Sequence, residues 1–223
     1  MKYHKNLLLV TMITFLFLLF CCASVQKSED KTVRLDSPRL APVAESEWND
    51  AQKKLLTPLK SYSKDGHVIN VFTTLARHPK GYQSWMTFGM HILLTNTIPA
   101  REREILILRT GWLCQSKYEF GQHTLVGKQA GLTDDEVLRI TKGPDASGWS
   151  AFDKALIRAA DELHRDSFIT DGTWNALSQS YDEKQLIDLI FTVGQYNLVC
   201  MALNSLGVQL DPGVPGFPEG AGS

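Results

Sequence analysis

Apolar side chains recur every three or four positions through most of this 223-residue chain, from about residue 45 to about residue 210. This spacing places them along one face of an α-helix, whereas no run alternates apolar and polar residues long enough to predict a half-buried strand. The pattern therefore predicts an all-α fold, a helical bundle around one core. With 43% hydrophobic residues, a chain of this length is expected to form a single domain over residues 45–210.

The expected helices can be placed from this pattern and from their start signals. We expect helices over 46–60, 79–95, 100–113, 150–165, 173–181 and 182–206. Two further starts carry a hydroxyl residue followed three positions later by glutamate, Ser116 with Glu119 and Thr133 with Glu136, which is the spacing of a capping box. The last helix is long and mostly apolar, so much of its circumference should be buried in the core or against another subunit.

The two ends of the chain differ in composition from the domain. Residues 1–23 place basic residues before a charge-free apolar run, which is typical of a signal peptide or a membrane anchor. We therefore expect an exported protein of the cell envelope, as a lipoprotein or an anchored protein, or a secreted one, with membrane contact only through this segment. Residues 24–44 are predicted to be a polar linker and residues 211–223 an irregular tail, because both are rich in turn-forming or polar residues.

The charge of the chain does not favour nucleic acid as a partner. The 23 basic and 24 acidic residues give a formal net charge of −1, without long blocks of one sign. A nucleic-acid surface needs a basic patch, so a small-molecule substrate is the expected partner. The glycine-rich nucleotide motifs and the serine-hydrolase elbow are also absent from the sequence.

Glu119 and His123 are the centre of the candidate site, since they stand four residues apart on one predicted helix. At this spacing two side chains share a helix face and can meet. A neighbouring carboxylate can orient an imidazole and raise its basicity, as a general base requires. Two other interpretations stay open at this point: Glu119 only completes the capping box with Ser116, or the pair is solvated on the surface.

The stretch from Glu104 to His123 resembles the core motif of the carboxymuconolactone decarboxylase and alkylhydroperoxidase D family, in which a glutamate lies twelve residues before a C-x-x-C-x-x-x-H. With His123 aligned on the histidine, Ser116 and Glu119 occupy the two cysteine positions, and Glu104 the glutamate position. The resemblance covers roughly residues 70–210. It implies an alkylhydroperoxidase D-like helical bundle that assembles as a homo-trimer or hexamer, with these four side chains lining one pocket.

The loss of both motif cysteines predicts that a standard dithiol peroxidase cycle is absent, because a hydroxyl cannot be oxidised and returned as a thiolate can. The resemblance implies instead decarboxylation or isomerisation of a small carboxylated or lactone-like substrate, without a metal or organic cofactor. In this reading His123 is the general acid or base, and Glu119 and Glu104 orient it or relay protons. Tyr118, beside them, would donate a hydrogen bond to developing negative charge.

Other candidates carry a structural alternative. Ser116 is assigned to substrate binding, and Arg109 could hold a substrate carboxylate or form an ordinary ion pair. Trp85 stands in an apolar stripe with Met86 and Met90 that could close the pocket, although such stripes more often pack into a core. Carboxylates and imidazole also suit divalent ions, but no H-x-H or H-E-x-x-H accompanies them, so no metal is expected.

Two other classes of function stay open. An alkylhydroperoxidase or peroxiredoxin-type antioxidant activity would have to run through Cys114, which lies two positions before the family's cysteine position. Cys114 and Cys200 both stand in apolar helical segments, where cysteines are usually inert and buried. The third class is a non-catalytic binding protein at the envelope.

Overall fold

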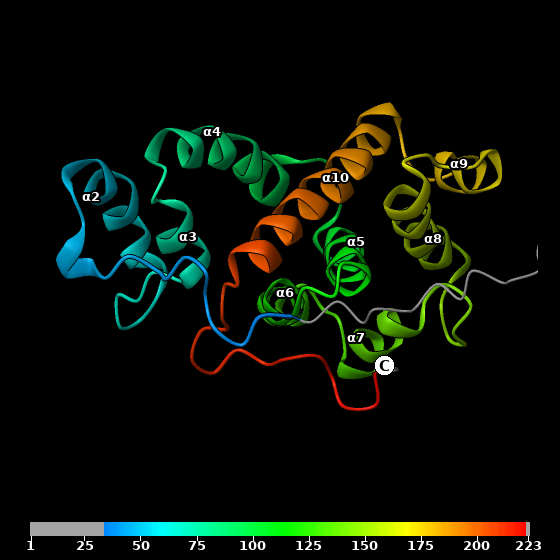
Figure 1. The fold of residues 1–223 in the computed structure, drawn as a ribbon. Coiled ribbons are helices and arrows are strands. Elements are labelled where there is room, and N and C mark those ends of the chain that lie inside the picture. Colours follow the sequence, from blue (N-terminus) through cyan, green and yellow to red (C-terminus); the bar gives the residue numbers. More distant parts are fainter. Residues whose placement is uncertain (1–33, 222–223) are drawn as a thin grey trace, which may run out of the picture. The chain divides into compact units, whose positions relative to one another are not determined.

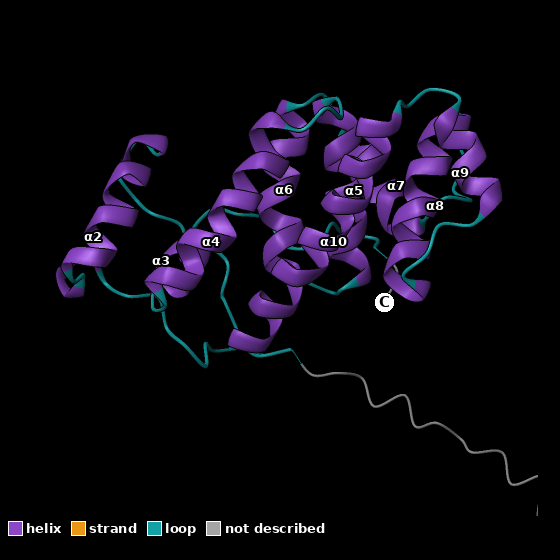
Figure 2. Ribbon diagram, turned by 90° about the horizontal axis from the view of Figure 1, so that it is seen from above, coloured by secondary structure: helices purple, strands orange, loops and turns teal. Residues whose placement is uncertain are grey.

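The computed structural model describes residues 34–221, so the predicted signal or anchor segment lies outside the described residues. All regular structure in the described part is helical, and it contains no strand (Figure 1 and Figure 2). The all-α prediction is confirmed.

The helices and short helical turns follow in the order η1 (Glu45–Glu47), α2 (Asp50–Leu56), η2 (Thr57–Tyr62), α3 (Asn70–Leu75), α4 (Pro79–Met90), η3 (His91–Thr95), α5 (Ala100–Leu113), α6 (Lys117–Gln129), α7 (Asp134–Lys142), α8 (Ala151–Asp166), α9 (Asp171–Ser178) and α10 (Glu183–Leu206). From α5 onwards these elements match the predicted helices to within a few residues. The predicted helix 46–60 changes to a 3₁₀ turn where Pro58 enters it, and the helix 79–95 ends in the π-helical turn η3.

Helix α5 is the centre of the bundle and packs against α6, α8 and α10. Its consecutive residues Ile105, Leu106, Ile107 and Leu108 are all fully buried, so the helix is enclosed on every side rather than on one stripe. Helices α2, α3 and α4 lie to one side of α10, and α8 and α9 lie to the other (Figure 1 and Figure 2). Any polar side chain on α5 must therefore find its partners inside the protein.

The predicted polar linker differs from the structure over its described part. The Arg34 guanidinium donates to the carbonyl oxygen of Cys114 over 2.8 Å, and the Leu40 amide donates to the Leu206 carbonyl over 3.3 Å. Val43 is buried in the cluster formed by α2 and α4. Residues 34–44 are thus packed against the domain. Their sequence shows no helical periodicity, because they lie against the domain in a non-helical, extended conformation.

The C-terminal tail is irregular, as predicted, but it is also packed. The Phe217 ring meets the rings of Trp112 and Phe120 edge to face, with centroids 5.0 and 5.3 Å away. Gly121 on α6 faces the carbonyl oxygen of Pro215, and an added Cβ there would lie only 2.1 Å from it. The tail therefore lies directly on α6, where a larger residue at Gly121 would displace it.

Helix α10 combines exposed and buried apolar residues. Within residues 34–221 it is the one helix long and apolar enough to cross a membrane, and 56% of its most apolar window is buried in the bundle. Core helices pass the same test, and α10 packs on α5, α6 and α8. We assign it to the core of the bundle.

Candidate functional site

Helices α5 and α6 bring Glu104, Glu119 and His123 together inside the bundle. Nδ1 of His123 lies 2.6 Å from Oε2 of Glu104, and Nε2 lies 3.1 Å from Oε1 of Glu119. Glu104 is fully buried, and Glu119 and His123 are only 5% and 8% exposed. The Glu119–His123 pair predicted from the i, i+4 spacing is therefore buried and not solvated. A second carboxylate, Glu104 of α5, binds the same imidazole.

The close approach of α5 and α6 depends on glycine. A Cβ added at Gly127 of α6 would lie 3.3 Å from Cδ1 of Leu108 and 3.6 Å from Cβ of Glu104, both on α5, and 3.0 Å from Cδ1 of Leu132. The contacts of 3.0 and 3.3 Å with the two leucines are tighter than ordinary van der Waals packing. Gly127 thus lets the backbone of α6 approach the turn of α5 that carries Glu104.

The charges of this cluster balance one another. Burial by itself lowers the pKa of His123, but Glu104 and Glu119 outweigh that effect and raise the pKa to about 10. His123 is therefore an imidazolium at neutral pH, which donates Nδ1–H to Glu104 and forms an ion pair through Nε2 with Glu119. The Arg103 guanidinium lies 3.4 Å from the other oxygen of Glu104, so two cations face two carboxylates. The ring of Tyr196 packs edge to face on the imidazole at 4.9 Å between centroids.

The predicted capping box at the start of α6 is wrong. The Ser116 hydroxyl makes no cap hydrogen bond, and its Oγ is buried without a hydrogen-bond partner. The backbone turns sharply at Gln115, whose φ is 50°, and the Ser116 amide donates to the carbonyl of Gly111 over 2.8 Å. Because that amide is already satisfied, Glu119 has nothing to cap. Its side chain is free to bind His123.

The second predicted capping box is confirmed. Thr133 and Glu136 exchange the expected side-chain to backbone hydrogen bonds at the start of α7. The same motif, one hydroxyl residue and one glutamate three positions apart, thus has two outcomes in this chain. The difference is whether the preceding helix has already taken the N-cap amide.

Tyr118 is buried next to the cluster but its hydroxyl is used elsewhere. It donates to Oδ2 of Asp211 over 2.6 Å and accepts from the amide of Val71 over 3.1 Å. Burial and the Asp211 carboxylate raise the pKa of Tyr118 well above its ordinary value. The predicted role as a donor to developing charge is not supported by this placement, because the proton is already committed to the tail.

Arg109 does not belong to the candidate site. Its Nε and Nη2 donate to the two carboxylate oxygens of Asp161 over 2.5 and 3.1 Å, and Nη1 donates to the carbonyl oxygens of Ile140 and Thr141 over 2.8 and 3.2 Å. All three nitrogens are occupied, so Arg109 ties α5 to α8 and to the last turn of α7. The prediction that it holds a substrate carboxylate is corrected to the alternative, a structural ion pair.

Trp85 also has a structural position. Its ring packs on those of Phe72 and Tyr82, with centroids 6.4 and 5.9 Å away, in the cluster around α2, α3 and α4. Its indole Nε1 is buried without a hydrogen-bond partner. Trp85 therefore follows the core alternative, not the substrate-binding one.

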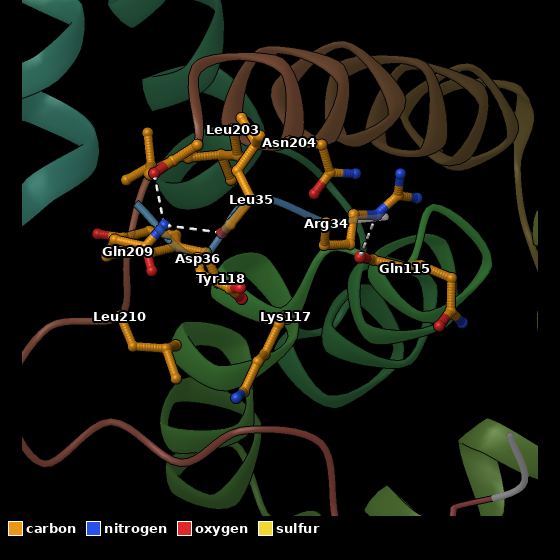
Figure 3. Close-up of a pocket in the computed structure, with 12 residues that line it drawn as sticks. Arg34, Leu35, Asp36, Gln115, Lys117, Tyr118, Leu203, Asn204, Gln209 and Leu210 are labelled. Atoms are coloured by element: carbon orange, nitrogen blue, oxygen red, sulfur yellow. Dashed lines mark hydrogen bonds between the residues drawn. The ribbon is translucent and has the colours of Figure 1, made fainter. Parts of the chain in front are cut away.

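A cavity of about 340 Å³ opens at the start of α6 (Figure 3). Its walls come from the first residues of α6, the last turn of α10 and the packed strip that begins at Arg34. Figure 3 shows Tyr118, Lys117 and Asn204 around this space. Glu119 and His123 are not among its lining residues, so the cavity does not open onto the carboxylate–imidazole cluster.

The cluster is not arranged as a metal site. Glu104 and Glu119 approach different nitrogens of the His123 ring, so their oxygens do not converge on one point. Among the described residues, no group of three histidine, cysteine or acidic side chains is placed to share an ion.

Three residues of the site were missed in the sequence. Arg103 and Tyr196 complete the surroundings of the cluster, and Asp211 binds Tyr118. Arg103 precedes Glu104 directly, and that adjacency was the available signal. Asp211 stands in a proline- and glycine-rich tail, where no local pattern indicates a buried carboxylate.

The fold and the cluster define an all-helical protein of the alkylhydroperoxidase D-like class. Residues 79–162 match the model of the carboxymuconolactone decarboxylase family. This match supports the family resemblance that the motif between Glu104 and His123 predicted. No curated protein of comparable sequence was found.

Solved structures with the same fold come from several bacteria. An uncharacterised peroxidase-related protein with an alkylhydroperoxidase AhpD core, from Ralstonia eutropha JMP134, is 17% identical, with a TM-score of 0.68 over 78% of this chain and 93% of that one. A peroxidase-related protein from Silicibacter sp. TM1040 is 15% identical, with a TM-score of 0.67 over 84% and 96%. The debrominase Bmp8 in complex with 2,3,4-tribromopyrrole is 10% identical, with a TM-score of 0.66 over 81% and 95%. At these identities the likeness concerns the fold.

Proposed function

We propose that the protein is an enzyme that decarboxylates or isomerises a small carboxylated or lactone-like substrate by proton transfer. The single observation that carries this proposal is the buried His123 imidazole held between Glu104 and Glu119. A cap or a surface ion pair would explain Glu119 without function, and the side chain makes neither. An imidazolium between two carboxylates is instead a stored proton in a site that excludes water.

Glu119 is the member of the cluster through which a proton would reach a substrate. Its Oε1 binds His123, whereas both oxygens of Glu104 are engaged, one by His123 and one by Arg103. In a decarboxylation the C–C bond to the leaving carboxylate breaks, and its electron pair remains on carbon as a carbanion or enolate. The His123 imidazolium would first pass its Nε2 proton to the Glu119 carboxylate, and Glu119 would then deliver that proton to the carbon, which leaves His123 neutral.

Because its pKa is raised, His123 would act as the acid in this scheme. With a pKa of about 10 the ring is protonated before the reaction begins. Glu104 and Arg103 then hold the ring in one orientation while its proton moves. The broader expectation of a general acid or base is thereby narrowed to an acid supported by two carboxylates.

Two substitutions test the proposal on a panel of lactones and β-keto or γ-carboxy acids. Glu119→Gln keeps the size of the side chain and can still bind His123, but its amide cannot accept and release a proton. We expect it to lower turnover by about 100- to 10,000-fold. His123→Gln should do the same. Glu183→Gln, on the exposed first turn of α10, is the matched control. Turnover that persists in both site variants, with the fold intact by circular dichroism, would contradict the proposal.

We further propose that the protein is exported to the cell envelope, on the composition of residues 1–23. Fractionation of cells that produce the full chain tests this, and recovery only in the cytoplasmic fraction would refute it. If the protein consumes no compound of the panel, whichever cell fraction it is recovered from, the non-catalytic binding function becomes the better explanation.

A further inference from the structure

Cys114 occupies a built position at the end of α5. Its thiol donates to Oδ1 of Asn197 over 3.3 Å, and its carbonyl oxygen accepts from Nδ2 of Asn204 over 2.9 Å. The Arg34 guanidinium binds the same carbonyl over 2.8 Å. The side chain is half-buried, so small molecules can reach it. Nδ1 of His164 lies 3.7 Å from the sulfur at its exposed side.

Cys200 faces Cys114 from α10. It follows Asn197 by three residues and precedes Asn204 by four, so all three side chains lie on one face of that helix. Both asparagines bind Cys114, so the face of α10 that also carries Cys200 is turned toward Cys114. Cys200 is fully buried on that face of α10.

The two thiols differ in their readiness to ionise. The neighbouring Cys200 thiol and the Arg34 guanidinium lower the pKa of Cys114, against the opposing effect of burial. The interaction with Cys114 and complete burial raise the pKa of Cys200 well above its ordinary value. The accessible sulfur is thus the nucleophile, and the buried one keeps its proton.

We propose that Cys114 and Cys200 form a redox-active dithiol pair, which a small hydroperoxide oxidises to a disulfide between α5 and α10 and which a low-molecular-weight thiol reduces again. Neither cysteine stands at a position of the C-x-x-C motif, and they are far apart in the sequence. The pair is therefore a separate site from the Glu104–His123–Glu119 cluster and does not depend on the proposed acid–base function.

The reaction balances without any further component. The Cys114 thiolate attacks one oxygen of the hydroperoxide, so that an S–O bond forms, the O–O bond breaks and the other oxygen leaves as an alcohol after taking a proton. Cys200 then attacks the Cys114 sulfur. The S–S bond forms, the S–O bond breaks, and the hydroxide leaves with the Cys200 proton as water. Two molecules of the small thiol return the disulfide to two thiols by exchange and become a disulfide themselves.

Peptide mapping of the full chain tests the pair. Trypsin places Cys114 in peptide 110–117 and Cys200 in peptide 185–223, and the cysteines of the N-terminal segment in peptide 6–27. After treatment with stoichiometric hydrogen peroxide and alkylation of the remaining thiols, we expect the first two peptides to be joined. Dithiothreitol should separate them, so that both thiols become available for alkylation again.

Two variants separate the roles of the cysteines. In Cys200→Ser the linked peptide should disappear and dimedone should label Cys114 as a sulfenic acid. In Cys114→Ser the Cys200 thiol should stay reduced over the time in which the unchanged protein is fully oxidised. Dimedone labelling of Cys114 in the unchanged protein without the linked peptide, or an unreacted Cys114, would overturn the proposal. These readouts need no substrate of the acid–base reaction, so each proposal can fail without the other.

Discussion

At the scale of the residue, one buried imidazole organises the charges of the candidate site. Glu104 is fully buried on a helix that is enclosed on all sides, and such a carboxylate is tolerated only when it is paired. His123 and Arg103 provide that pairing. The arrangement links the protonation of one ring to the stability of the whole domain.

This linkage predicts that stability falls at alkaline pH. The folded-state pKa of His123, about 10, lies above the ordinary value of 6.5 that it would have in the unfolded chain. The stabilisation is therefore fully present below about pH 6.5 and is lost as the pH rises through about 10, by an amount on the order of a few kcal/mol. Urea unfolding measured from pH 6 to pH 10 checks it. His123→Gln should flatten this slope, and an identical slope in the variant would contradict the assignment.

At the scale of the element, the spacing of α5 and α6 is set by small residues. Gly127 has little room for a Cβ against Leu108 and Leu132, whereas Gly172 on α9 has open space around it. Both are helical glycines, so the intrinsic gain in helix propensity from alanine is similar at the two positions. The two sites differ only in what the added methyl group meets.

The pair of substitutions Gly127→Ala and Gly172→Ala should therefore have opposite effects. We expect Gly127→Ala to destabilise the protein by about 1 kcal/mol or more, since overpacking exceeds the gain in propensity. Gly172→Ala should stabilise it by up to about 1 kcal/mol. Urea unfolding of both variants measures the difference. Equal stabilisation by both would show that α5 and α6 are not held at the described distance.

The C-terminal tail behaves as an element although it has no regular structure. The Asp211 carboxylate accepts from Tyr118 and from Gln122 over 2.6 and 2.7 Å, and from the Asn70 amide over 2.9 Å. One side chain thus joins α6, the start of α3 and the tail. His67 adds a further contact over 2.8 Å.

Removing this carboxylate should release the tail. Asp211→Ala leaves buried donors without an acceptor, and we expect a loss of about 3 kcal/mol and faster proteolysis after residue 211. The matched control is Asp145→Ala, whose side chain is 89% exposed in a surface pair with Arg158 and should change stability by less than about 0.5 kcal/mol. Similar losses in the two variants would indicate that the tail is held mainly by Phe217.

At the scale of the whole molecule, an apolar surface remains uncovered. Ile187, Phe191 and Met201 on α10 are 50%, 45% and 62% exposed, and the ring of Phe88 on α4 packs edge to face on Phe191. Monomeric proteins rarely leave such a continuous apolar face in water. The expectation that part of α10 is buried against another subunit concerns this exposed side of the helix.

We expect this face to bind a second copy of the chain, within the homo-trimer or hexamer that the family resemblance implies. Light scattering on the folded protein would give the mass of the assembly. A charge in the middle of the face, Phe191→Lys, should lower that mass to that of smaller species with little change in secondary structure. A mass of one chain for the unchanged protein would contradict the expectation.

The sequence by itself determined the helical fold class, the family resemblance and the three residues of the central cluster, Glu104, Glu119 and His123. Local signals were enough for these, because helical periodicity and the spacing from Glu104 to His123 do not depend on distant contacts. The helices from residue 100 onwards could be placed for the same reason. Short helices escaped this reasoning, and α3 was missed because six residues carry too little periodic signal.

Only the tertiary structure decided what each polar side chain does. Whether Glu119 caps a helix or binds an imidazole depends on which carbonyl the Ser116 amide has already found, and that partner lies on the preceding helix. Arg109 is not a site residue because it binds Asp161, and the spacing of Cys114 and Cys200 in the sequence did not indicate the dithiol pair that we propose. Buried polar groups are satisfied by neighbours in space. Their roles therefore follow from the packing of α5, α6 and α10.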